Sequence, residues 1–286
     1  MIKVLLFADL SPMDDSLFYN AELMMNELDI SEICVCHYVE IQEVTQDVQH
    51  YLKDLEDPLD EILADEFKKM AEDHNVPEDI LSFKIHMHGG KDSLVEWINK
   101  SDYNLCMFGK KIVHVGLGGF SSRLLRLVDK PVLFITETTN FSINRVLFPT
   151  EFSAHTERAA VILNDVKGDR PYEFLSVLHV YHLDPVYFPF MVKHSERMIK
   201  KVEDHVKNEL KSFCKKNFPN QEVEQVAIYA DDKPTARIIY DYAITHRVDM
   251  VVIGIKGDTD DENILVGSVA DSLIQTDKNI PVLLIR

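Results

Sequence analysis

The sequence predicts an α/β fold made of two tandem domains, each built on a five-stranded parallel sheet. The prediction rests on an internal repeat and on short, continuous apolar runs that alternate with segments of helical period. Continuous apolar strands are typical of parallel sheets that helices cover on both faces. A chain of 286 residues is also long enough for about two domains.

The two halves of the chain open and close alike. Residues 2–11 read IKVLLFADLS and residues 144–153 read NRVLFPTEFS, so each half opens on an apolar strand that ends in an acid and a Ser. Residues 130–135 read KPVLFI and residues 280–285 read IPVLLI, so the halves also close on matching strands. The same order of elements lies between these ends, which indicates an internal duplication.

A linker joins the two predicted domains. Residues 136–140 are polar and show no apolar period, so we expect a first domain of residues 1–138 and a second of residues 143–286. Each domain ends in an apolar strand at a sheet edge that must be paired or covered. We expect Val132–Ile135 and Val282–Ile285 to pair in antiparallel fashion, which would make the two domains an intrachain pseudo-dimer.

The elements between these ends follow from the periodicity. Strands are expected near Lys3–Phe7, Ile33–Tyr38, Ser82–His88, Leu105–Phe108, Val132–Ile135, Arg145–Phe148, Phe174–Val180, Val223–Tyr229, Met250–Ile253 and Val282–Ile285. Helices of the second half are expected over Thr156–Val166, a segment capped by Ser195 that includes Ile199 to Phe213, Pro234–His246 and Val269–Gln275. Such sheets bind ligands at the carboxyl ends of their strands.

Composition and charge exclude several classes of protein. A formal net charge of −18 disfavours a nucleic-acid partner, because phosphate backbones would be repelled. The first residues do not read as a secretory signal, and no apolar run approaches the ~20 residues of a membrane span, so we expect a cytoplasmic protein without a membrane partner. The four cysteines lack CxxC spacing and are interpreted as reduced core thiols.

One segment carries the clearest chemical signal. Ile253 closes a strand, Gly254 and Gly257 follow within a loop, and after nine more residues Gly267 and Ser268 open a helix. Glycines let the backbone approach a ligand closely, and the first N–H groups of a helix bind anions. The same residues could instead form an ordinary turn with Ser268 as a helix cap.

The Gly254-x2-Gly257-x9-Gly267-Ser268 spacing resembles the ATP-binding motif of the nucleotide-binding universal stress proteins. The opening strand and the duplicated PVL(L/F)I ending add to this resemblance, which covers both halves. It implies a Rossmann-like fold of the adenine nucleotide alpha hydrolase-like type and ATP as the ligand. It also implies binding residues: Thr150, Glu151 and Val180 around adenine and ribose, and Gly254, Lys256, Gly257, Gly267, Ser268 and Val269 around the phosphates. Ile253, which closes the strand before Gly254, is expected to bind the nucleotide as well.

The second half departs from that family's pattern at several charged positions. Glu151 stands where the family usually has Asp, and Lys256 stands where it often has His. The following loop holds four acids, and their charge would weaken ATP binding unless they face solvent or a divalent cation bridges them to the phosphates. We expect a bridging divalent cation: Asp258 and Asp260 would be ligands of a Mg²⁺ ion that is also bound to the nucleotide.

The first half departs further. Ile112 replaces the second glycine, and the loop before Gly118 is shorter, so its nucleotide site is expected to be degenerate. Asp9, Lys110, Lys111 and Arg123 leave open a different anion or a smaller nucleotide there. His86 and His88 could ligate a metal, but a structural role for this pair is favoured.

The predicted function is a nucleotide-binding stress-response module that acts as a sensor or regulator. No nucleophile or general base stands out, so at most slow ATP hydrolysis is expected. Two alternatives stay open: a scaffold of the same fold that binds no nucleotide, and an enzyme of adenylate-transfer type. The aromatic segment of residues 184–191 is either a loop over the sheet edge or a lid or docking surface for an unknown protein partner, and a homodimer is possible.

Overall fold

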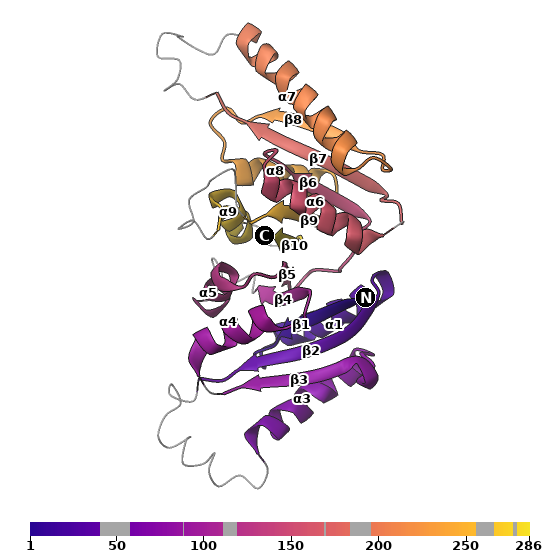
Figure 1. The fold of residues 1–286 in the computed structure, drawn as a ribbon, viewed down its shortest axis with the longest axis vertical. Coiled ribbons are helices and arrows are strands. Elements are labelled where there is room, and N and C mark those ends of the chain that lie inside the picture. Colours follow the sequence, from indigo (N-terminus) through magenta and orange to yellow (C-terminus); the bar gives the residue numbers. More distant parts are fainter. Residues whose placement is uncertain are drawn as a thin grey trace. The chain divides into compact units, whose positions relative to one another are not determined.

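The computed structural model describes residues 1–40, 58–87, 89–110, 119–168, 170–183, 196–255, 266–276 and 279–286. These residues form two compact units, Met1–Phe141 and Ser142–Arg286. Each unit is an α/β domain (Figure 1), so the predicted fold class of two tandem five-stranded parallel sheets is confirmed.

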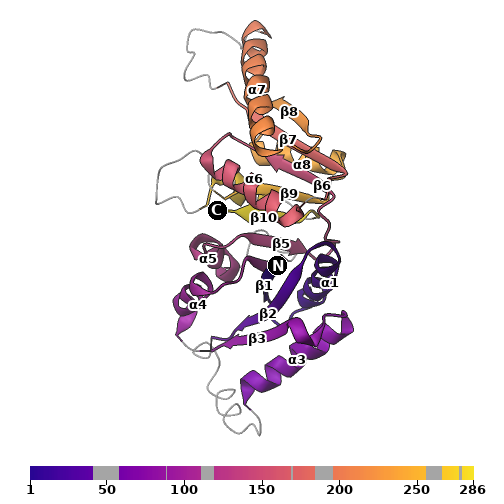
Figure 2. The ribbon, with the colours of Figure 1, turned by 45° about the vertical axis from the view of Figure 1, so that its right-hand side comes forward.

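In the first unit, the sheet has the order β3-β2-β1-β4-β5, and the four pairings of neighbouring strands are parallel. Its strands are β1 (Ile2–Phe7), β2 (Ile30–Tyr38), β3 (Leu81–His86), β4 (Leu105–Lys110) and β5 (Val132–Thr136). Its helices are α1 (Met13–Glu27), α3 (Leu59–Asp73), α4 (Gly90–Lys100) and α5 (Gly119–Leu127), with a short 3-10 turn, η2 (Glu78–Ile80). Helices α1 and α3 lie on one face and α4 and α5 on the other (Figure 2).

The second unit repeats this plan with the order β10-β9-β6-β7-β8, again through parallel pairings. Its strands are β6 (Arg145–Pro149), β7 (Phe174–Tyr181), β8 (Glu224–Tyr229), β9 (Met250–Gly254) and β10 (Val282–Ile285). Its helices are α6 (Ala154–Lys167), α7 (Glu196–Asn217), α8 (Thr235–Thr245) and α9 (Ser268–Thr276). Helices α6 and α7 contact one another, as do α8 and α9, and the two pairs cover opposite faces of the sheet.

The central strands of both sheets are buried along almost their whole length, which explains their continuous apolar sequences. Leu5, Leu6, Val146, Leu147 and Phe148 are at most 1% exposed. Burial on both faces requires apolar side chains at successive positions rather than at alternate ones. All four cysteines are buried and free, which agrees with their interpretation as reduced core thiols.

Two sequence predictions differ from the structure or fall outside it. Strand β3 ends at His86, two residues before the predicted end at His88, and His86 is buried. His88 and the predicted helix cap Ser195 lie outside the described residues, as does the aromatic segment 184–191. Among the residues that are described, no group of three or more His, Cys, Asp or Glu side chains could hold a metal ion.

The internal duplication extends to details of the backbone. After the opening strand of each unit, one non-glycine residue has a left-handed conformation: Leu10 with φ 58° and Phe152 with φ 66°. These residues occupy matching positions of the two repeats. Because a non-glycine side chain seldom adopts positive φ, the shared conformation indicates that both turns are held by tertiary contacts.

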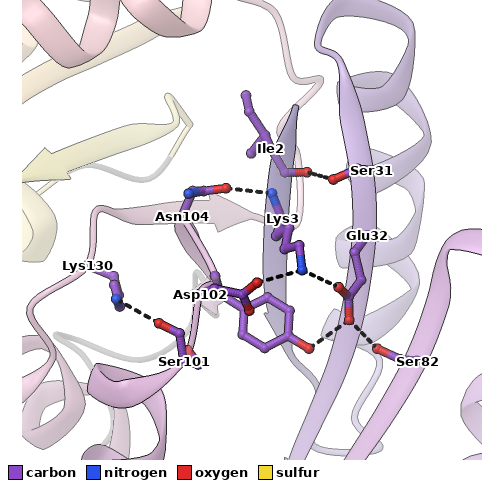
Figure 3. Close-up of polar contacts among 10 residues, drawn as sticks. Ile2, Lys3, Ser31, Glu32, Ser82, Ser101, Asp102, Asn104 and Lys130 are labelled. Atoms are coloured by element: carbon purple, nitrogen blue, oxygen red, sulfur yellow. Dashed lines mark hydrogen bonds and ion pairs between the residues drawn. The ribbon is translucent and has the colours of Figure 1, made fainter.

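A polar network ties together the amino ends of the strands in the first unit (Figure 3). The Lys3 ammonium lies 2.7 Å from Asp102 and 3.2 Å from Glu32. Glu32 also accepts hydrogen bonds from the hydroxyls of Tyr103, at 2.9 Å, and Ser82, at 3.1 Å. The network therefore crosslinks β1, β2 and β3 with the segment that leads into β4.

A related contact recurs in the second unit. The Lys3 N–H donates to the Asn104 side chain at 2.9 Å, and the matching Arg145 N–H donates to the Asp249 carboxylate at 3.0 Å. Both contacts fix the start of the opening strand against the residues before β4 or β9. These networks lie at the amino ends of the strands, which leaves the carboxyl ends to form the cavities described below.

The end of the first unit packs against its own first helix. Asn20, on α1 and fully buried, donates to the carbonyl oxygen of Thr139 at 3.0 Å and accepts from the N–H of Phe141 at 2.7 Å. The predicted linker of residues 136–140 is thus bound to α1 by hydrogen bonds. Hydrophobic periodicity could not predict this packing, because a side-chain amide rather than an apolar face makes the contacts.

Candidate functional site

A cavity of about 270 Å³ opens at the carboxyl edge of the sheet in the second unit. Its walls come from the ends of β6, β7 and β9 and from the first residues of α8 and α9. Parallel strands place their carboxyl ends at one edge, so residues distant in the sequence converge there. The cavity lies where the strand order predicts a ligand crevice.

Eight of the ten residues proposed from the sequence to bind the nucleotide line this cavity: Thr150, Glu151, Val180, Ile253, Gly254, Gly267, Ser268 and Val269. The other two, Lys256 and Gly257, lie outside the described residues. So do Asp258 and Asp260, the expected ligands of Mg²⁺, together with the other acids of their loop.

The entrance to α6 forms a polar wall of the cavity. Ser153 caps the helix by accepting the N–H of Thr156 at 3.3 Å, and the Thr156 hydroxyl donates to the carbonyl oxygen of Ser153 at 2.8 Å. The Thr150 hydroxyl accepts the N–H of Phe152 at 3.0 Å. Thr150 and Thr156 are buried while Glu151 is exposed, so the only carboxylate among the described lining residues stands at the solvent side.

The start of α9 forms the facing wall. The N–H of Gly267 donates to the carbonyl oxygen of Ile255 at 2.6 Å, which ties the start of this helix to the end of β9. The N–H groups of the first helical turn have no acceptor inside a helix, and they carry partial positive charge. Ser268, Val269 and Ala270, which begin α9, all line the cavity. This wall can therefore accept an anionic group.

Sequence reasoning missed several lining residues, of which His182 and Thr235 are the most polar. His182 directly follows β7 and Thr235 begins α8, and the His182 Nε2 atom lies 2.8 Å from the Thr235 hydroxyl. Both residues lie at the carboxyl edge of the sheet, where binding residues are expected. His182 could have been predicted from its position directly after β7. Tyr181, the last residue of β7, does not line the cavity and is buried against Tyr229.

His179 supports the cavity from behind. Its Nδ1 atom lies 2.7 Å from the carbonyl oxygen of Thr150, and its ring stacks on Phe152 with centroids 4.6 Å apart. Burial lowers the pKa of His179 below its usual value, with the hydrogen bond to Thr150 opposing this effect. A neutral imidazole therefore holds the turn that carries Thr150 and Glu151.

The first unit has a cavity at the corresponding edge, of about 340 Å³. Asp9 and Ser121 line it, together with Gly109, the last residue but one of β4. A Cβ atom on Gly109 would lie only 2.3 Å from Cγ of Met13. The close packing of Met13 therefore requires a glycine at position 109. The matching glycine of the second unit, Gly254, lines the cavity there.

The cations that could have supported an anion in the first unit are engaged or placed elsewhere. Arg123 forms an ion pair with Asp92 at 2.6 Å, and Lys110 is buried and is not among the lining residues. Lys111, Ile112 and Gly118 lie outside the described residues. The described wall of this cavity contains Lys91 as its only cation and three carboxylates, of Asp9, Asp14 and Glu40.

The profile of the universal stress protein family matches residues 142–286, which is the whole second unit. The chain belongs to the universal stress protein family. The resemblance inferred from the glycine spacing is therefore confirmed at the level of the family. A search among curated proteins finds no match.

Two solved structures of universal stress proteins share the fold over 99% of this chain. A universal stress protein from Archaeoglobus fulgidus DSM 4304 is 16% identical, with a TM-score of 0.66 over 99% of this chain and 98% of that one. A putative universal stress protein from Pseudomonas aeruginosa UCBPP-PA14 is 14% identical, with a TM-score of 0.59 over 99% and 93%. An Archaeoglobus fulgidus universal stress protein solved in complex with dAMP is 19% identical over 51% of this chain and all of its own, with a TM-score of 0.33.

The helices of the described residues differ from membrane-spanning helices. None of them combines the length and the apolar character that crossing a bilayer requires.

Proposed function

We propose that the second unit binds an adenine nucleotide, with ATP as the expected ligand, and that the protein acts as a sensor or regulator in a stress response rather than as an enzyme. One observation carries the proposal: eight of the binding residues expected from the sequence and its family resemblance line one cavity beside the start of α9. Family membership supports the same conclusion. We expect this role to be exercised in the cytoplasm, through a protein partner still to be identified.

The chemistry of the cavity suits such a ligand in two parts. Val180, Ile239 and Ile253 offer an apolar surface for a planar base, and the adjacent Thr150 and Glu151 offer oxygen atoms for ribose hydroxyls. The N–H groups at the start of α9 would receive the phosphates, because a helix N-terminus favours negative charge. These residues are far apart in the sequence, but the parallel sheet brings the ends of their strands together at one edge.

The test begins with the protein as purified. Mass spectrometry of the nucleotides carried through purification, followed by calorimetric titration of ATP, ADP and AMP, is expected to show a bound adenine nucleotide and one site per chain. Binding of none of the three would contradict the proposal and favour a scaffold that acts through protein contacts alone. Turnover of ATP to AMP and pyrophosphate would instead identify an adenylate-transfer enzyme.

A further inference from the structure

The cavity of the first unit has a wall of mixed character. Phe7, Met13 and Phe108 are buried lining residues, and the rings of Phe7 and Phe108 stack with centroids 4.2 Å apart. Carboxylates line the same cavity beside this apolar surface. With about 340 Å³, the cavity falls within the size range of sites for small organic molecules.

Asp14 is the least usual of the lining carboxylates, because only 1% of it is exposed. Its oxygens accept the N–H of Leu10 at 2.7 Å and the N–H of Asp9 at 3.1 and 3.2 Å. The described residues provide no cation that forms an ion pair with it. Buried carboxylates are usually paired, so a buried carboxylate that faces a cavity without a counter-ion is an attractive position for a cationic ligand.

The ionisation of Asp14 agrees with this geometry. Burial, together with the negative charge of Asp9, raises the pKa of Asp14 to about 6, against the opposing effect of the backbone hydrogen bonds. The ionised carboxylate of Asp14 would be stabilised by a positive charge placed beside it in the cavity.

One ammonium group of the chain already shows how a cation is held here. The Lys91 ammonium lies 2.8 Å from the Glu40 carboxylate and 5.9 Å from the centroid of the Tyr38 ring. A carboxylate and an aromatic face are the usual partners of an ammonium ion. Lys91 neutralises Glu40, so the lining still holds more negative than positive charge.

The matching cavity of the second unit lacks these features. Thr156 stands in the place of Asp14, His182 in that of Glu40, and Val180 in that of Tyr38. Each replacement removes either a negative charge or an aromatic face. The two repeats therefore present opposite electrostatic preferences at equivalent sites, and the first unit disfavours the anions that the second can accept.

We propose that the cavity of the first unit binds a small organic cation, a primary ammonium group on a flat apolar body, with the ammonium beside Asp9 and Asp14 and the apolar body against Phe7, Met13 and Phe108. This proposal extends the role of the chain beyond the nucleotide site of the second unit. The first unit would then have a binding site for a different ligand, rather than a degenerate nucleotide site.

Three probes of almost equal shape test the proposal on the full-length chain: tryptamine, which is a cation at neutral pH, tryptophol, which is neutral, and indole-3-acetate, which is an anion. Calorimetric titration is expected to show binding of tryptamine, at least about tenfold weaker binding of tryptophol and no binding of indole-3-acetate. Equal binding of tryptamine and tryptophol, or preference for the anion, would overturn the proposal.

Variants locate the site. Asp14→Asn is expected to weaken tryptamine binding at least about tenfold, and Asp9→Asn, which changes an exposed side chain and should not disturb folding, by a smaller factor. The matched control is Asp241→Asn, which removes a charge on α8 of the second unit, at a residue that does not line the first cavity. Unchanged affinity in both cavity variants, or an equal loss in the control, would contradict the assignment of the site.

Discussion

The Nδ1 atom of His179 lies 2.7 Å from the carbonyl oxygen of Thr150, and the repeat holds its counterpart: Nδ1 of His37 lies 2.8 Å from the carbonyl oxygen of Ala8. A carbonyl oxygen only accepts hydrogen bonds, so Nδ1 must carry the proton in both contacts. In each unit, an imidazole of the second strand thus holds the end of the first. In the second unit that end begins the wall of the candidate nucleotide site.

The first prediction concerns His179. Replacement by Ala removes the donor to Thr150 and the stacking on Phe152, so we expect a loss of about 1–3 kcal/mol in the free energy of unfolding and weaker ATP binding. His179→Asn, which keeps a donor near the position of Nδ1, should recover part of both. Chemical denaturation and calorimetry measure the two effects. The matched control, His37→Ala, should destabilise the first unit without changing the ATP affinity, and a loss of that affinity would contradict the role given to His179.

The pH dependence of stability gives His179 a second readout. The pKa of His179 is lowered in the folded state, so the unfolded chain binds the proton more readily. The stability contributed by the neutral ring is fully present above the unfolded pKa of about 6.5 and is lost as the pH falls through the lowered folded value. Because Asn does not titrate, the stability of His179→Asn should fall less steeply than that of the parent as the pH drops below about 6.5.

The second prediction concerns the edges of the two sheets. Strand β5 ends the sheet of the first unit and β10 ends that of the second, and both are fully buried apolar strands. An unpaired apolar edge invites association, so we expect Val132–Ile135 and Val282–Ile285 to pair within one chain. Amide hydrogen exchange should then find protection at successive residues of both strands. Rapid exchange at alternate residues of either strand would show that its edge is open.

The third prediction addresses the close approach of backbone and ligand. Gly267 lines the cavity just before α9, and a Val there would place a branched side chain over the N–H groups proposed to receive phosphate. We expect Gly267→Val to abolish ATP binding in calorimetry while the chain stays folded. The matching change in the first half, Gly118→Val, should leave the affinity unchanged, and an equal loss from both changes would argue against a single nucleotide site.

The fourth prediction concerns the divalent cation. Two carboxylates within ~5 Å of a triphosphate would each weaken binding by on the order of 1 kcal/mol, unless Mg²⁺ is shared between carboxylates and phosphate oxygens. If Asp258 and Asp260 serve this purpose, excess chelator should sharply lower the ATP affinity of the parent. The Asp258→Asn, Asp260→Asn double variant should depend less on Mg²⁺. An affinity that chelation leaves unchanged in the parent would show that the acids face solvent.

Particular residues show what the sequence could and could not predict. The strands were predicted to within a few residues because strands buried on both faces have continuous apolar sequences, as around Leu5 and Leu147. The rule that carboxyl ends meet predicted the edge at which Thr150 lies near Gly254, and the family resemblance implied which residues line the cavity there. The contacts that escaped prediction are specific side-chain pairs between distant segments. His182 and Thr235 are 53 residues apart, and the packing of Met13 on Gly109 leaves no periodic signal.

The last prediction isolates the buried carboxyl of Asp14. Its pKa is raised from 3.8 to about 6 in the folded state, so the folded chain binds the proton more readily than the unfolded one. The ionised form therefore lowers stability at neutral pH by up to about 3 kcal/mol, and this penalty is relieved as the pH falls from about 6 towards 3.8.

Asp14→Asn removes this titration while keeping one oxygen to accept the N–H of Leu10. Between neutral pH and pH ~5, the parent should gain about 1 kcal/mol of stability relative to the variant, measured by denaturant unfolding of each protein at a series of pH values. Because the other acids of the chain titrate in both proteins, their contributions cancel in the difference. Parallel curves for parent and variant would mean that Asp14 keeps an ordinary pKa, and that solvent or an unrecognised cation already compensates its charge. A saturating concentration of tryptamine should flatten the parent's curve in the same window, because a bound ammonium group favours the ionised carboxylate.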